Sequence, residues 1–147
     1  MVNKSRSDVY NYLYNMFFGT VTDNVYSMNE PQELEDTDRT DGFIVVRVGD
    51  IHDESEFDGH TYGWVRCYVE AFVPPITRGR VDIEKYREFE EAIDAAIQLT
   101  IESTTDVDEY YIQEDSVLSS DADETSNANN TFFVFIKSFI VTIDKQE

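Results

Sequence analysis

The residues best suited to bind a metal ion lie close together between positions 52 and 60. This segment supplies imidazole and carboxylate groups, the ligand types of zinc and calcium sites, from His52, Asp53, Glu54, Asp58 and His60. Their order matches no known metal-binding loop, because a calcium loop spaces its oxygen ligands regularly around a glycine. We therefore interpret the segment as a solvated turn and expect no metal site.

The single cysteine is the other candidate for chemistry. Cys67 alternates with valines in a strand-like segment and has no histidine beside it, so we expect a buried packing residue and not a nucleophile. One cysteine forms no intramolecular disulfide. The 6 glycines are scattered, without a phosphate-binding cluster. These patterns predict that the protein is not an enzyme and holds no cofactor.

Acidic residues dominate the chain. There are 31 Asp and Glu against 11 Lys and Arg, a formal net charge of -20, which repels phosphate backbones and anionic lipid headgroups. We expect a soluble protein without membrane or nonspecific nucleic-acid binding. Arg78 and Arg80, on either side of Gly79, form the one concentrated basic spot. They either solubilise a loop or anchor the acidic face of an adjacent subunit.

Two helices are predicted to frame the fold. Residues 8–18 repeat apolar positions every three or four residues and stop before Gly19. Tyr10 and Tyr14 widen the apolar surface of this helix, which favours contact with a neighbouring subunit. The second helix, residues 82–101, begins at the capping residue Asp82 and buries one stripe, consisting of Ile83, Tyr86, Phe89, Ile93, Ala96, Ile97 and Thr100.

Strands are predicted over residues 24–28, 43–48, 62–73 and 131–144, the last with a kink or bulge at Lys137-Ser138. The segment 62–73 alternates between two faces. The small face should pack beneath a helix and comprises Val65, Cys67, Val69, Ala71 and Val73. The other face should be half-covered, by the first helix or by another protein, and comprises Trp64, Arg66, Tyr68, Glu70 and Phe72.

Three acidic segments, residues 29–42, 50–61 and 102–130, are predicted to be surface loops, the third with a short strand over 110–113. We expect one domain over residues 1–147, with its core in 24–28, 43–101 and 131–144. The fold class is α+β: a mainly antiparallel sheet with an amphipathic helix on one face and an additional N-terminal helix.

This order of elements resembles that of tail-terminator and tail-completion proteins of tailed bacteriophages, small α+β subunits that form rings. The resemblance is carried by the helix at 8–18, the hairpin of 43–48 and 62–73, the Pro74-Pro75 break, and the helix and closing strand that follow. It implies a structural virion protein, assembled in the host cytoplasm into a sixfold or twelvefold ring. Such a ring would join portal, neck or tail proteins around a channel through which DNA passes unbound.

Candidate subunit-interface residues are aromatic or basic: Trp64, Tyr68, Phe72, Tyr10, Tyr14, Arg78 and Arg80. Heterologous contacts between such surfaces close rings. The alternative is an acidic monomeric module that binds or inhibits by occupying a basic protein surface. A monomer with a clustered acidic face would favour it.

Overall fold

The computed structural model describes residues 5–29, 31, 33–55, 61–76, 80, 82–105, 109–121, 125–127 and 130–144. Its centre is a sheet with strand order β1-β2-β4-β7-β5, in which only β1 (Val25–Ser27) and β2 (Phe43–Val48) run parallel. The long strands β4 (Thr61–Val73) and β7 (Asn130–Asp144) pair antiparallel along twelve registered positions. The expected α+β class with a mainly antiparallel sheet is confirmed.

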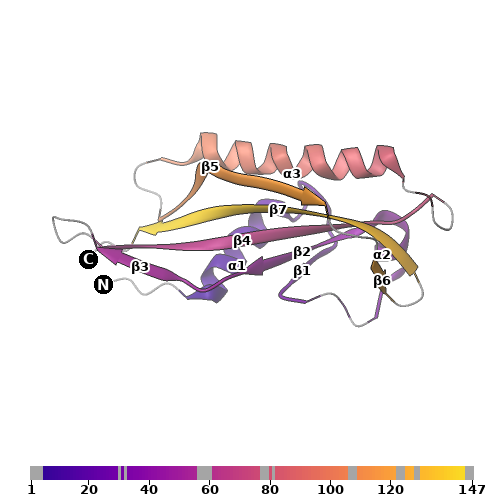
Figure 1. Ribbon diagram of the computed structural model, residues 1–147, viewed down its shortest axis with the longest axis horizontal. Helices are drawn as coiled ribbons and strands as arrows, with labels where there is room; N and C mark the ends of the chain where they lie inside the picture. Colours follow the sequence, from indigo (N-terminus) through magenta and orange to yellow (C-terminus); the bar gives the residue numbers. More distant parts are fainter. Residues whose placement is uncertain are drawn as a thin grey trace.

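Helices α1 (Arg6–Phe17) and α3 (Ile83–Ser103) cover one face of this sheet, here called the back face. Figure 1 shows α3 running along the length of the sheet, and α1 behind β2 and β4. The predicted small side of β4 lies beneath them, and Val65, Cys67 and Val69 are fully buried. Burying this apolar surface is the main source of the fold's stability.

Local sequence explains both helices. The side chain of Asp82 accepts a hydrogen bond from Lys85 N at 3.1 Å and caps α3, as predicted. Ser5 precedes α1, so this helix begins two residues before the predicted start. The predicted buried stripe of α3 is wrong at one position, because Ile83 in the first turn is 61% exposed.

The other face of the sheet, the front face, is covered at one end only. There a second apolar cluster joins Leu34 to alternate residues of the three central strands: Phe43, Val45, Phe72, Phe132 and Val134. We call this cluster the covered end. Its cover is the segment containing Leu34 and the short helix α2 (Asp36–Asp41).

A hydrogen bond and a glycine hold α2 in place. The hydroxyl of Tyr26 donates to Asp38 Oδ2 at 2.6 Å, and Asp38 is fully buried. Gly42 follows α2 with φ +83°, where a Cβ atom would lie 2.6 Å from the carbonyl oxygen of Phe72. A residue with a side chain would therefore force the chain away from the covered end.

Each of the three predicted surface loops contains regular structure. The first contains α2, and the second contains β3 (His52–Ser55), which pairs with β4. In the third, the short strand predicted over 110–113 is confirmed as the start of β5 (Tyr110–Asp121), which runs on into the predicted loop and is followed by β6 (Thr125–Asn127). Both strands pair with β7. Polar composition misled the prediction, because an edge strand obtains its hydrogen bonds from its neighbour and needs few apolar side chains.

The kink or bulge predicted in the last strand is also wrong. β7 keeps an unbroken register with β4 through Lys137 and Ser138, and the irregularity lies opposite, in β5 between Gln113 and Leu118. The Ser116 hydroxyl oxygen accepts a hydrogen bond from Ile140 N at 2.8 Å within this bulge. Lys137 fits in the strand because its ammonium group lies 2.6 Å from Asp94 of α3.

Candidate functional site

Beyond the covered end, the front face carries aromatic, aliphatic and basic side chains in rows across three strands. Residues paired in register point to the same side of a sheet. Three such rows cross β4, β7 and β5 in that order. They are Trp64, Thr142 and Tyr111; Arg66, Ile140 and Gln113; and Tyr68, Ser138 and Leu118. We call the surface formed by Trp64, Arg66, Tyr68, Tyr111, Leu118 and Ile140 the open face.

Three large side chains of the open face are exposed. Tyr68 is 38%, Tyr111 43% and Leu118 60% exposed. Trp64 is partly buried, and the ring of His52 stacks on it with centroids 4.3 Å apart. Aromatic and aliphatic side chains presented together by a rigid sheet are typical of the centre of protein–protein interfaces.

Two arginines on the front face are in different environments. Arg47 donates from Nε to Glu70 at 2.6 Å and also hydrogen-bonds to the carbonyl of Met28. Arg66, between Trp64 and Tyr68 along β4, has a buried Nη1 with no hydrogen-bond partner among the described residues. A buried donor without an acceptor is destabilising, so turning this guanidinium outward to a carboxylate or carbonyl oxygen of a partner would remove that cost.

The opposite side of the molecule is acidic. α3 carries six acidic and two basic residues, and its outward side is exposed. A line of side chains spaced three or four residues apart runs along this side: Glu84, Glu88, Glu91, Ala95, Leu99 and Glu102. We call it the acidic stripe. Leu99 is 62% exposed within it.

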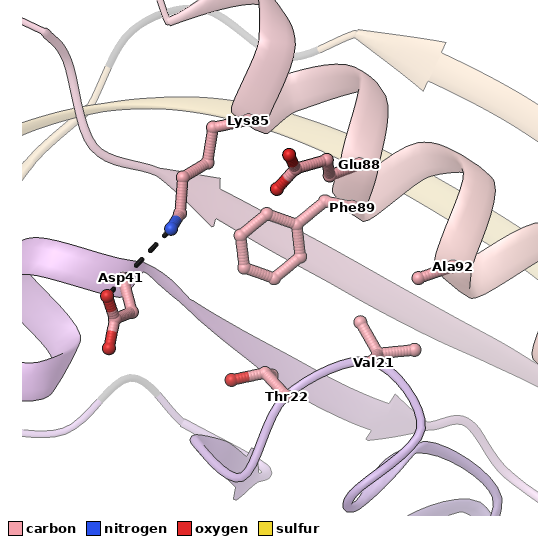
Figure 2. Close-up of a pocket in the computed structure, with 7 residues that line it drawn as sticks. All are labelled: Val21, Thr22, Asp41, Lys85, Glu88, Phe89 and Ala92. Carbon is pink, nitrogen blue, oxygen red and sulfur yellow. Dashed lines mark ion pairs between the residues drawn. The ribbon is translucent and has the colours of Figure 1, made fainter.

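One cavity, of about 240 Å³, lies between the start of α3, the end of α2 and the turn after α1. Figure 2 shows the ring of Phe89 beside Val21 and Ala92, with Glu88 and Thr22 at the rim. Lys85 Nζ reaches Asp41 Oδ1 at 3.9 Å. The cavity is smaller than the usual small-molecule site, and the exposed ion pair at its mouth contributes little energy.

The structure separates the residues predicted to contact another subunit. Trp64 and Tyr68 lie on the open face, and Arg80 is exposed in the connection before α3. Tyr14 is exposed on α1, where it stacks on Phe18 with ring centroids 5.0 Å apart. Arg78 lies outside the described residues.

Two of these candidates must be corrected. Phe72 is 1% exposed and stacks on Phe43 in the covered end. Tyr10 is 7% exposed, and its hydroxyl accepts a hydrogen bond from Val48 N at 3.1 Å. Both are core residues of this chain. The proposal that α1 half-covers the face of Trp64 and Tyr68 is also wrong, because α1 packs on the back face.

The segment considered for metal binding becomes part of a hairpin. Its first half is strand β3, whereas Asp58 and His60 lie outside the described residues. Among the residues that the structure does describe, no three His, Cys, Asp or Glu side chains are grouped to hold a metal ion. Cys67 is fully buried, and burial raises the pKa of its thiol to about 12, which keeps it protonated and unreactive at neutral pH.

Sequence reasoning placed Arg66 on this side of the strand without making it an interface candidate. It missed three residues of the open face altogether: Tyr111, Leu118 and Ile140. The first two lie in the segment predicted to be mostly loop, although Tyr110-Tyr111-Ile112 was a local strand signal. Their position beside Trp64 and Tyr68 depends on β5 adding to the far edge of β7.

The sequence matches no known family model, and no curated protein matches it either. Of the helices that the structure describes, including the 21-residue α3, none has the length and apolar composition of a membrane span.

Proposed function

We propose that this protein is a structural subunit of a tailed-bacteriophage virion that assembles into a ring in the head-to-tail connector, in the neck or at the tail end. The observation that supports a role in assembly is the open face. A sheet with helices on its back face leaves Tyr68, Tyr111 and Leu118 exposed on its front. The order of elements supports the phage assignment, through the resemblance described above.

The charge of the chain fits a ring around DNA. Each copy carries a formal charge of -20, so a ring of several copies presents an acidic surface along which DNA moves without binding. Neighbouring portal, neck or tail proteins would contact the ends of such a ring. On this proposal the protein has no catalytic role and its location is the virion.

The test is the mass of the purified chain in solution, measured by light scattering from about 0.05 to 0.5 M salt. Copies with the same charge repel one another, and salt screens this repulsion. We therefore expect species of six or more copies that become more abundant as salt increases, alone or with neighbouring virion proteins. A chain that stays monomeric in every condition, with or without those proteins, contradicts the proposal.

The acidic stripe favours a second candidate, a monomeric module that occupies a basic protein surface. Its glutamates Glu84, Glu88 and Glu91 are exposed along one side of α3. The same experiment separates the two functions, because a complex between opposite charges weakens as salt increases. A one-to-one complex with a basic protein, lost at high salt, would support the second candidate.

A further inference from the structure

Two surfaces on opposite sides of this molecule have complementary chemistry. The open face carries Arg66 between Trp64 and Tyr68 along β4, with the residue partly buried and its Nη1 enclosed. The acidic stripe presents carboxylates on either side of the aliphatic residues Ala95 and Leu99. One surface is basic and aromatic, and the other is acidic and aliphatic.

The directions of the two surfaces follow from the fold. α3 buries Phe89, Ile93 and Ile97 against the back face of the sheet, so its acidic stripe points away from the sheet. The open face belongs to the front of the same sheet. A contact between the two surfaces therefore cannot form within one chain, but it can form repeatedly between successive copies.

Arg66 is the residue of the open face that could form an ion pair with a second copy. Its Nη1 is buried and lacks an acceptor in the described part of the chain, unlike Arg47, which has Glu70. Nη1 is enclosed in the free chain, so the Arg66 side chain must turn outward to meet a second copy. A carboxylate of that copy then supplies the missing acceptor in a partly buried, charge-assisted hydrogen bond. One ion pair between copies that each carry a formal charge of -20 leaves the net repulsion in place, so assembly should still increase with salt.

An exposed leucine on each surface could form an apolar contact between two copies. Leu118 on the open face is 60% exposed and Leu99 in the acidic stripe is 62% exposed. Both project from regular elements, a strand and a helix, which position them before any contact forms. Packing Leu99 near Tyr68, Tyr111 and Leu118 would remove apolar surface from water on both copies.

We infer that the open face of one copy covers the acidic stripe of a second copy, with a stripe glutamate bound to Arg66 and Leu99 packed among the exposed side chains of the open face. The inference rests on the proposed ring, for which it names the two surfaces in contact. Because the surfaces differ, the contact is heterologous and each copy retains one free surface for the next. In a closed ring the open face and the acidic stripe of every copy are both covered.

Cysteine crosslinking tests this arrangement. The variant with both Leu99→Cys and Leu118→Cys, treated with a short bismaleimide, should give a ladder of crosslinked multimers. Each single variant should give none, and an equimolar mixture of the two single variants should give a dimer and nothing larger. Wild type is the control for Cys67, which is fully buried and should remain unlabelled.

Charge reversal tests the ion pair independently. Arg66→Glu alone, or Glu88→Lys with Glu91→Lys, should raise the concentration needed for half-assembly by more than about tenfold, since each variant places like charges opposite one another. An equimolar mixture of the two variants should assemble again, because the introduced glutamate of one variant attracts the introduced lysines of the other. The matched control for Arg66→Glu is Arg39→Glu, and the control for the double variant is Asp23→Lys with Glu33→Lys. These controls make the same changes of charge at exposed positions outside both surfaces, and they should assemble as wild type does.

The outcomes separate the two proposals. A wild-type chain that never assembles overturns the ring and this contact together. A ring that forms but survives both charge reversals unchanged overturns only the contact. Crosslinking of Leu118→Cys to itself would also overturn it, because that product requires two open faces to meet. Circular dichroism of each variant verifies that a loss of assembly is not a loss of folding.

Discussion

The two ends of the front face differ in burial although both carry aromatic residues on the same side of β4. Phe72 and Tyr68 are aromatic residues four positions apart on β4 and point to the same side, yet Phe72 is 1% and Tyr68 38% exposed. Only Phe72 lies beneath the segment of Leu34 and α2. Whether an aromatic strand residue becomes core or surface therefore depends on a segment elsewhere in the chain.

The two ends also differ in the aromatic contacts that add to the free energy of burial. At the covered end, Phe43, Phe72 and Phe132 contact one another in stacked and edge-on pairs with centroids 4.5 to 6.2 Å apart. Such pairs add to the free energy gained by burial. On the open face Trp64 stacks on His52, whereas the exposed rings of Tyr68 and Tyr111 would gain this energy from a partner chain.

Removing an aromatic side chain from each end should show the largest contrast. Phe72→Ala should lower the free energy of unfolding by about 3–5 kcal/mol, because it leaves a cavity in a packed cluster. Tyr68→Ala, the matched change on the open face, should cost about 1 kcal/mol or less in the monomer. Urea unfolding of both variants measures the difference, and equal losses would contradict the distinction between the two ends.

The buried carboxylate that holds α2 should have the next largest effect. Asp38 accepts hydrogen bonds from the Tyr26 hydroxyl at 2.6 Å and from Glu35 N at 3.0 Å. Asp38→Ala should lower the free energy of unfolding by about 1–3 kcal/mol, since both donors lose their acceptor. Asp36→Ala is the control in the same helix, and its fully exposed side chain should leave stability within about 0.5 kcal/mol of wild type in the same urea titration.

The other partner of this hydrogen bond predicts a pH dependence. Burial, followed by the hydrogen bond to Asp38, raises the pKa of the Tyr26 phenol above its ordinary value. Above about pH 10 the unfolded chain loses this proton while the folded chain keeps it, so the Tyr26 contribution falls as pH rises.

Tyr26→Phe tests that contribution. It should cost about 1 kcal/mol at neutral pH, where one hydrogen bond is lost. The difference from wild type should shrink as pH rises above about 10. Urea unfolding of the two proteins at a series of pH values measures it. A constant difference would show that Tyr26 has no raised pKa.

The smallest expected effect on stability is on the open face. Leu118→Ser should leave the free energy of unfolding within about 0.5 kcal/mol of wild type, because this side chain is 60% exposed. On the proposed contact it should nevertheless weaken assembly, measured by light scattering. Ile76→Ser, at a residue that is 67% exposed and outside both proposed surfaces, should change neither property.

Local patterns were sufficient to predict the helix-covered half of the fold. The stripe of α3, the cap at Asp82 and the alternation of 62–73 each depend on residues close together in sequence, and the structure confirms them apart from Ile83. Polar segments were predicted less well. α2 and β5 are stabilised by distant partners, Tyr26 in one case and β7 in the other, and no local pattern identifies a distant partner.

Only part of the open face was predicted, again because no local pattern identifies a distant partner. Trp64 and Tyr68 were recognised from alternation within one strand, whereas Phe72, which shares that alternation, proved to be core. Tyr111, Leu118 and Ile140 joined the surface only through the pairing of β5 with β7. Strand pairing brings residues from distant positions side by side.

The sequence by itself determined the acidity of this protein, the burial of Cys67, the two long helices and the two-faced strand of residues 62–73, because composition and short-range periodicity specify them. Only the tertiary structure decided which part of the front face is covered, that Nη1 of Arg66 lacks an acceptor within the described chain, and that the acidic stripe lies on the opposite side of the molecule. These features arise from contacts between segments far apart in sequence, and such contacts depend on how the whole chain packs.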